Sequence, residues 1–310
     1  MTRMFTFKKL SFLLTVCLVL HVSLFGQVTN NVEPQKENGF DRKSNFNVEE
    51  LKVRWKKAAL ENCPGVPCTI VPPPPSFTCG TSTVTDIDNN IYNTVLIGNQ
   101  CWTRENLKVT KYNDGTSVTL DATQTSPGDG TSPTWENRTA GAYTIYDNET
   151  SSGVNATNYG FLYNWYAAKG VVSTGSTAYK NLCPTGWHVP LDAEWTILIK
   201  ELDPSQLVNS SNVLTMKGAQ STSAGGKLKA NSTLWRTNTG TNNYLFSGLP
   251  GGYRDYDGAF YYDSFFANFW SATESSISEA WQRSLLHGAS SILRNTDTKN
   301  YGLSVRCLKD

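Results

Sequence analysis

The chain has 310 residues, of which 17% are charged and 12% aromatic, and its formal net charge is +1. Lysine and arginine are spread along the chain without the basic stripe that nucleic-acid binding requires, so we expect no nucleic-acid partner. The aromatic content argues against disorder and is typical of a packed or recognition domain.

The N-terminal residues have the pattern of a secretory signal peptide. A basic start, with Lys8 and Lys9, precedes a mainly apolar run over 10–25, and we expect cleavage after Gly26. A spanning helix needs about 20 apolar residues, and Cys17 lies inside the run rather than at a lipidation site. We therefore expect a secreted, periplasmic or cell-surface protein with no transmembrane segment after cleavage.

Two further segments precede the main domain. Val48, Leu51 and Trp55 recur at helical spacing and predict an amphipathic helix over 48–61, which we expect to pack on the main domain rather than on a second copy or a partner. Prolines 72–75 predict a stiff spacer. The predicted organisation is a signal peptide over 1–26, a helix and proline-rich spacer over 27–76, and one domain over 77–310.

Cysteine usage agrees with export. Cleavage leaves an even set: Cys63, Cys68, Cys79, Cys101, Cys183 and Cys307. Such a set predicts disulfides, although spacing alone leaves the pairing open. There is no C-x-x-C motif, and only His188 and His287 remain, so we expect no zinc site.

The pattern from residue 77 onwards predicts the α+β class. Strand formers at 83–85 and 91–97 flank a turn at 88–90, and a helix begins near Asp192. Further ordered structure is predicted at 161–168, with strands at 244–249, 267–272, 280–286 and 303–308. The polar segments 113–158 and 208–243 predict loops. Short strands around few helices favour α+β over βαβ winding, and we find no internal repeat.

Four motifs in order carry a family resemblance. They are Thr85-Asp86-Ile87-Asp88-Asn89-Asn90-Ile91-Tyr92 through Ile97-Gly98-Asn99-Gln100-Cys101-Trp102 and Glu105-Asn106-Leu107; Tyr159-Gly160-Phe161-Leu162-Tyr163-Asn164-Trp165; Cys183-Pro184-Thr185-Gly186-Trp187-His188-Val189-Pro190 through Glu194-Trp195; and Phe269-Trp270-Ser271 through Ser304-Val305-Arg306-Cys307. Together they resemble the Fibrobacter succinogenes major paralogous domain, a family of exported bacterial proteins, over about residues 79–310.

The resemblance implies a compact fold related to the C-type-lectin-like and formylglycine-generating-enzyme group, with short antiparallel strands, few helices, long loops and disulfides. It implies the pairs Cys183–Cys307 and Cys79–Cys101, which leaves Cys63–Cys68 to close a short loop. One departure is Leu191, where such motifs often have a capping Ser or Thr. We expect Asp192 to cap the helix instead, or the helix to start less firmly.

No catalytic constellation stands out. Every mature cysteine has an expected partner, so the two free thiols of a formylglycine-generating oxidase are not predicted. A G-x-S-x-G motif is absent, and we attribute Asp192 and Glu194 to the helix start rather than to a glycosidase pair. We expect His188 to be buried and hydrogen-bonded, and His287 has no assigned role. Five tryptophans are assigned to the core: Trp102, Trp165, Trp187, Trp195 and Trp270.

Two acidic clusters in the sequence have the oxygen ligands that calcium prefers. The Glu-Pro-Asn, Gln-Pro-Asp and Trp-Asn-Asp motifs of the lectin relatives do not occur. Asp86-x-Asp88-x-Asn90 places oxygen ligands at alternate positions, but a turn is expected there and we favour the turn. Asp255 and Asp257 have the same ambiguity. We therefore expect no metal site and no cofactor, with calcium as an alternative that lacks lectin-motif support.

The remaining signal is a cluster of aromatic and charged residues over 252–266, which we expect to be partly buried. Its candidate ligand-binding residues are Tyr253, Arg254, Asp255, Tyr256 and Tyr261. Stacking rings with polar rims suit carbohydrate or protein contacts. We predict an exported, non-catalytic binding or structural module at the cell surface, with a glycan or protein partner at 252–266 and 113–158. The alternatives are an enzyme acting on extracellular polymers and a subunit of a surface assembly docking through 48–61.

Overall fold

The computed structural model describes residues 76–122, 135–173, 179–205 and 217–310, all of which belong to the unit Pro74–Asp310. The predicted signal peptide, the helix over 48–61, the proline spacer and the Cys63–Cys68 pair lie outside the described residues. No helix in the described ranges has the length and apolar character needed to cross a bilayer.

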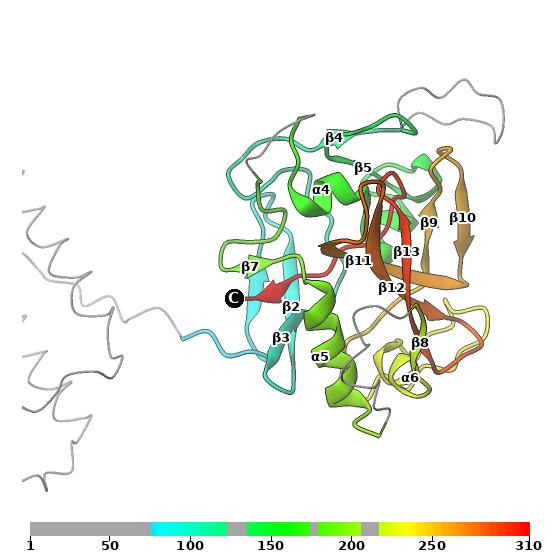
Figure 1. Ribbon diagram of the computed structural model, residues 1–310. Coiled ribbons are helices and arrows are strands. Elements are labelled where there is room, and N and C mark those ends of the chain that lie inside the picture. Colours follow the sequence, from blue (N-terminus) through cyan, green and yellow to red (C-terminus); the bar gives the residue numbers. More distant parts are fainter. Residues whose placement is uncertain (1–75, 123–134, 174–178, 206–216) are drawn as a thin grey trace, which may run out of the picture. The chain divides into compact units, whose positions relative to one another are not determined.

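A five-stranded antiparallel sheet is built from segments at both ends of the domain (Figure 1). Its strands, in spatial order, are β1 (Thr83–Thr85), β2 (Ile91–Ile97), β3 (Gln100–Thr103), β14 (Leu308–Lys309) and β7 (Trp187–His188). The predicted strands at 83–85 and 91–97 and the turn between them are confirmed. The predicted strand at 303–308 is largely wrong. Its first residues form isolated bridges, Tyr163–Leu303 and Phe269–Ser304, because they pass between sheets rather than along one.

The larger sheet has six strands in the order β10-β9-β11-β12-β13-β8. They are β8 (Gly218–Ser221), β9 (Gly251–Arg254), β10 (Phe260–Asp263), β11 (Phe266–Glu274), β12 (Glu279–Leu286) and β13 (Ile292–Thr298). All neighbours are antiparallel except β9 and β11. The strands expected at 267–272 and 280–286 are confirmed as β11 and β12.

The remaining described elements are a small sheet and several helices. A small sheet contains β4 (Thr119–Leu120), β5 (Ala142–Thr144) and β6 (Leu162–Tyr163), and the helices are η1 (Tyr146–Asn148), α3 (Val154–Tyr159), α4 (Trp165–Lys169), α5 (Asp192–Leu202) and α6 (Ala224–Leu228). The β-rich architecture with few helices belongs to the α+β class. The loop predictions for 113–158 and 208–243 were too broad, because strands of two to four residues leave little periodicity to read.

The strand predicted at 244–249 is a turn. Leu245 and Ser247 have φ values of 58° and 56°, in the left-handed region that an extended strand cannot contain. Asn242 explains the bend, because its side-chain oxygen accepts a hydrogen bond from the Ser247 amide at 2.9 Å. The local side-chain bond replaces the ladder bonds of a strand.

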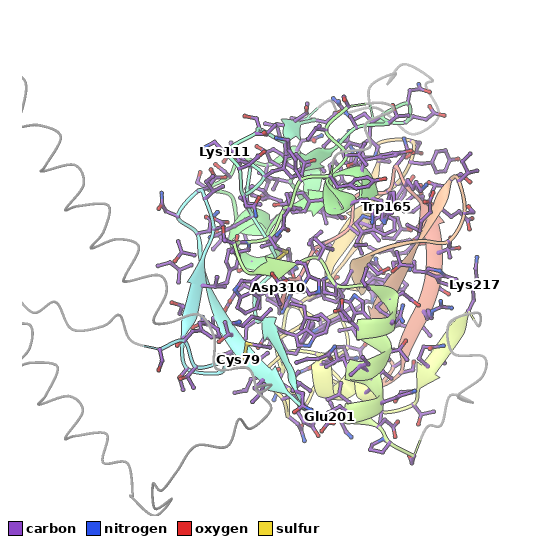
Figure 2. All side chains as sticks on the ribbon, turned by 60° about the vertical axis from the view of Figure 1, so that its left-hand side comes forward. Cys79, Lys111, Trp165, Glu201, Lys217 and Asp310 are labelled. Carbon is purple, nitrogen blue, oxygen red and sulfur yellow. A yellow bond between two sulfur atoms is a disulfide. The ribbon has the colours of Figure 1, made fainter. Side chains whose placement is uncertain are left out.

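The helix α5 packs on one face of the larger sheet (Figure 1). Its apolar stripe, Trp195, Leu198, Ile199 and Leu202, forms one core cluster with Phe269, Leu285 and Ile292 of the sheet. A second cluster joins α4 and the small sheet to the C-terminal segment. Side chains fill the interior between the sheets in Figure 2. All five tryptophans assigned to the core are buried there.

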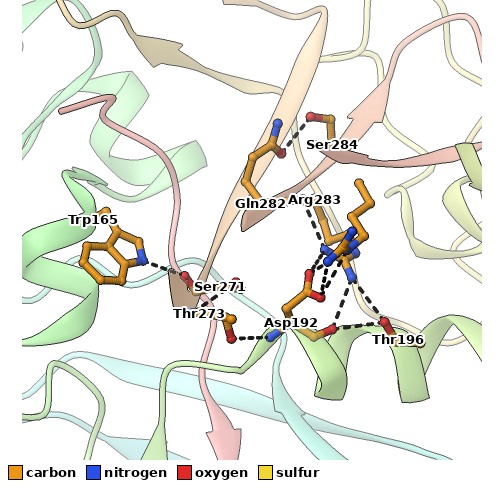
Figure 3. A network of polar contacts seen from close by, with 9 residues as sticks. Trp165, Asp192, Thr196, Ser271, Thr273, Gln282, Arg283 and Ser284 are labelled. Carbon is orange, nitrogen blue, oxygen red and sulfur yellow. Dashed lines mark hydrogen bonds and ion pairs between the residues drawn. The ribbon is translucent and has the colours of Figure 1, made fainter. Parts of the chain in front are cut away.

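Asp192 is not the cap of α5, which corrects the prediction from the sequence. Its carboxylate is buried against Arg283 and Arg294 (Figure 3). The free amides at the helix start are satisfied from elsewhere: Thr273 Oγ1 accepts from the Asp192 amide at 3.0 Å, and the Glu194 carboxylate accepts from the Leu191 amide at 2.7 Å. A hydroxyl from β11 therefore supplies the cap that Leu191 lacks.

Both disulfides implied by the family resemblance are present. Cys79 pairs with Cys101, and Cys183 pairs with Cys307 across 124 residues. The second pair is fully buried in the core. It joins the segment before β7 to the segment before β14, and so fixes the two strands that lie side by side in the first sheet.

Candidate functional site

Five tyrosines meet on the larger sheet and its neighbouring loops, and we call this surface the tyrosine face: Tyr253, Tyr256, Tyr261, Tyr262 and Tyr301. Ring contacts connect all of them. Tyr253 lies 6.1 Å from Tyr261, 5.9 Å from Tyr262 and 5.7 Å from Tyr301 between ring centroids, and Tyr256 lies 6.2 Å from Tyr301. The β9–β10 hairpin and the distant residue Tyr301 therefore supply one aromatic surface.

Local structure explains how the rings come together. Tyr253 of β9 is directly opposite Tyr261 of β10 in the antiparallel register, so both side chains lie on the same side. Tyr262 has a φ of 60°, which breaks the alternation and turns its ring toward Tyr253. The partial burial expected for this segment is confirmed: Tyr253 and Tyr261 are half-buried, whereas Tyr256 and Tyr262 are each 49% exposed.

The tyrosine face lies on the side of the sheet away from α5. Successive residues of a strand point to opposite faces. Arg283 and Leu285 point to α5, so Gln282 and Ser284 of β12 point the other way. Asp297 of β13 shares this side, because it is opposite Ala280 in the register.

Two carboxylates lie among the rings. Asp255 lies beside the Tyr301 hydroxyl, and burial raises the pKa of the Asp255 carboxyl. Burial, together with the negative charge of Asp255, raises the pKa of Asp297 to about 6. We call Asp255 and Asp297 the acid pair. The charge of Asp255 disfavours the ionisation of Asp297, because like charges in a desolvated site repel.

A polar network extends from the acid pair under the rings. The Gln282 side chain lies beside Asp297 and lowers the pKa of that carboxyl. The Ser284 hydroxyl lies 2.9 Å from Gln282 Oε1 (Figure 3) and 2.7 Å from Asn268 Oδ1. Gln282, Ser284 and Asn268 are all buried. Buried polar side chains that satisfy one another hold a surface in one arrangement.

The structure brings together four of the five predicted ligand residues. Tyr253, Asp255, Tyr256 and Tyr261 meet on the tyrosine face. Arg254 does not, because alternation turns it inward: it is fully buried, donates to the Gly258 carbonyl at 2.9 Å and pairs with Asp121. Sequence reasoning missed Asp297, Gln282 and Tyr301, which lie far along the chain. The alternating pattern of 292–298 could have predicted a strand. It could not have predicted that this strand pairs with β12 and so brings Asp297 to the tyrosine face.

The acidic turns use their carboxylates internally. Asp86 Oδ1 accepts from the amides of Asp88 and Asn90, each at 2.9 Å, and Asp88 binds Thr110 and Lys111. The turn expected over 86–90 is confirmed. In the β9–β10 turn, Asp257 accepts from the Ala259 amide at 2.9 Å. No group of three or more His, Cys, Asp or Glu side chains in the described ranges is placed to hold a metal ion.

His188 is hydrogen-bonded, as expected, but only half-buried. Its Nε2 lies 3.0 Å from the Glu194 carboxylate and its Nδ1 lies 2.6 Å from Asp310. The hydrogen bond to Glu194 has the largest effect, and together with the bond to Asp310 it raises the pKa of His188 to about 9. The imidazole is therefore charged at neutral pH and joins α5 to Asp310, the residue that follows β14. His287 packs against the Phe265 ring at 5.0 Å.

From Ile97 onwards, the ordered motifs described above lie within a region that matches a known domain family. The model of the Fibrobacter succinogenes major domain matches residues 95–309. The chain belongs to this family. No curated protein and no solved structure matches it.

Proposed function

We propose that this protein is an exported binding module that recognises a glycan on its tyrosine face. The observation that carries the proposal is the convergence of five tyrosines from separate segments around Asp255 and Asp297. Tyrosine rings stack on the apolar faces of sugar rings, and carboxylates and amides accept or donate hydrogen bonds to hydroxyl groups. Partly exposed rings on a rigid sheet suit this chemistry because little ordering is needed on binding.

The proposal includes an extracytoplasmic location for the protein. The signal-peptide pattern of residues 1–26 and the two disulfides support an oxidising, extracytoplasmic location. We further propose that the domain is related to the C-type-lectin-like group. This relation is supported by its short antiparallel strands, its long connections and the disulfide near the C-terminal strand.

The test is a glycan array probed with the oxidised chain, with calcium and with chelator. Binding that is lost in Tyr253→Ala and Tyr256→Ala, but retained in Tyr179→Ala, supports the proposal. Tyr179 is the matched control because it is 59% exposed and lies outside the tyrosine face. Loss of binding in chelator would indicate a metal that assists recognition. A blank array from a folded sample would rule out glycan recognition and favour a protein partner.

A second candidate, hydrolysis of an extracellular polymer, is favoured by the acid pair. Two carboxyl groups with raised pKa values beside a binding surface are the arrangement that a general acid requires. Reducing-end release from the array's best ligands would test it. Activity that is abolished in Asp297→Asn while binding persists would establish an enzyme; binding without turnover would leave the binding module.

A further inference from the structure

A cleft of about 310 Å³ lies outside the tyrosine face. It is bounded by the start of β2, by residues 104–108 after β3, by α3, and by the turn at 247–249. Its polar lining includes Arg104, Glu105, Asn106, Lys108, Asn158 and Arg306. The volume is at the small end of ligand sites in proteins, which run from roughly 300 to 1,000 Å³.

Arg306 lines this cleft, and its charged guanidinium has no direct ion pair among the described residues. It is 1% exposed, and its guanidinium donates to Asn106 Oδ1 at 2.5 Å and to the carbonyls of Thr103 and Phe246 at 2.9 and 2.8 Å. Its acceptors in the described part of the chain are all neutral. Burial lowers the pKa of Arg306. A buried cation without a direct ion pair leaves a positive field at the site.

Glu105 offsets only part of the positive charge in the lining, since it is the one carboxylate there. Glu105 favours the charge of Arg306 through space, but both Glu105 oxygens accept hydrogen bonds from Asn93, at 2.8 and 2.9 Å. Arg104 adds a second guanidinium and uses its Nε on the Leu245 carbonyl. Lys108 adds an ammonium whose Nζ has no hydrogen-bond partner among residues the structure describes.

We propose that this cleft binds a small oxyanion, a carboxylate or a sulfate ester, on Lys108 and Arg104 with Arg306 behind them. Three cations oppose one carboxylate in the lining, and charge-assisted hydrogen bonds to oxyanions are the strong contacts that such groups make. Asn106 and Asn158 provide amides for neighbouring hydroxyl groups. This site is independent of the tyrosine face, so either can fail without the other.

Calorimetric titration of the whole chain tests the site with three probes: sodium glucuronate, sodium sulfate and glucose, at constant ionic strength set with chloride. We expect saturable binding of at least one anion and none of glucose, which matches glucuronate except for the carboxylate. Binding of glucuronate alone supports a carboxylate ligand, and binding of sulfate alone supports a tetrahedral oxyanion such as a sulfate ester. No saturable heat with either anion overturns the proposal.

Two variants locate the binding. Lys108→Gln and Arg104→Gln are each expected to weaken the anion about tenfold, the loss of one charge-assisted contact. Lys108 is the safer variant because its side chain has no described hydrogen bond to lose. Lys200→Gln, an exposed lysine on α5, is the control. Equal affinity in Lys108→Gln, Arg104→Gln and Lys200→Gln would show that the anion binds elsewhere and would overturn the assignment.

Discussion

The Asp192 carboxylate and the Arg294 guanidinium form a two-pronged ion pair, with Arg294 Nε 3.0 Å from Oδ1 and Nη2 2.8 Å from Oδ2. Arg283 Nη1 donates to the same carboxylate at 2.6 Å. All three side chains are buried. One carboxylate therefore joins the start of α5 to two strands of the larger sheet, in the place where the sequence suggests only a helix-dipole contact.

Replacing Asp192 with Asn should destabilise the protein by about 3–5 kcal/mol, because two buried guanidinium groups lose their counter-charge. Chemical denaturation of the oxidised chain measures the difference. Glu201→Gln, on the exposed end of the same helix, should change stability by less than about 0.5 kcal/mol. A loss for Asp192→Asn as small as that of the control would show that the ion pair adds no net stability.

The two disulfides should differ in their contribution. Cys183–Cys307 closes 124 residues and Cys79–Cys101 closes 22. Loop-closure entropy then predicts that removing the first pair costs about 1.5 kcal/mol more than removing the second. The paired Cys→Ala variants, compared by denaturation, give the two values directly. An equal loss would mean that the unfolded chain does not follow the entropy argument.

His188 should make stability depend on pH in alkaline solution. Its pKa rises from 6.5 to about 9 on folding, so the folded state holds a proton that the unfolded state has released. The contribution is complete below pH 6.5 and is lost as pH rises through about 9. We expect about 1 kcal/mol after solvent screening. The stability difference between wild type and His188→Gln should shrink from pH 6 to pH 10; a difference that stays constant over this range would contradict the prediction.

Asp297→Asn should stabilise the protein at neutral pH. The pKa of Asp297 is raised to about 6 by burial and by Asp255, so its ionisation opposes folding. The folded state keeps its proton up to about pH 6, and the stability of the wild type falls as pH rises from 3.8 to that value.

Melting experiments at two pH values test the Asp297 prediction. We expect a gain of about 1–2 kcal/mol at pH 7.5 that disappears near pH 4. Asp147→Asn, an exposed acid in η1, is the control. A gain at pH 7.5 would indicate that Asp297 is retained for a role other than stability; a loss at that pH would contradict the predicted direction of its pKa.

Local patterns predicted the elements that local forces determine. The strands around the 86–90 turn, the start of α5 and the strands β11 and β12 follow from periodicity and turn chemistry within a few residues. The ordered motifs predicted the family and, through it, both observed disulfides. Short strands such as β4 and β14 could not be predicted in this way, since two residues carry no period.

The site was only half predictable for the same reason. The crowding of tyrosines over 253–262 is visible in the sequence, so most of one side of the tyrosine face was identified. Asp297 and Tyr301 join it only because β13 pairs with β12 and because the chain then turns back toward β9. Arg254 was assigned to the surface because composition does not say which residue of a strand faces inward.

The position of β14 has a consequence for when the domain can fold. Leu308 pairs with Trp102 on one side and with His188 on the other, so strands β3 and β7 have no common neighbour until residue 308 has been made. Contacts of this sequence separation give a high contact order, and folding that waits for them is slow. We expect this sheet to form only after synthesis has passed residue 308. Until then the edge of β3 that will face β14 and both edges of β7 stay unpaired.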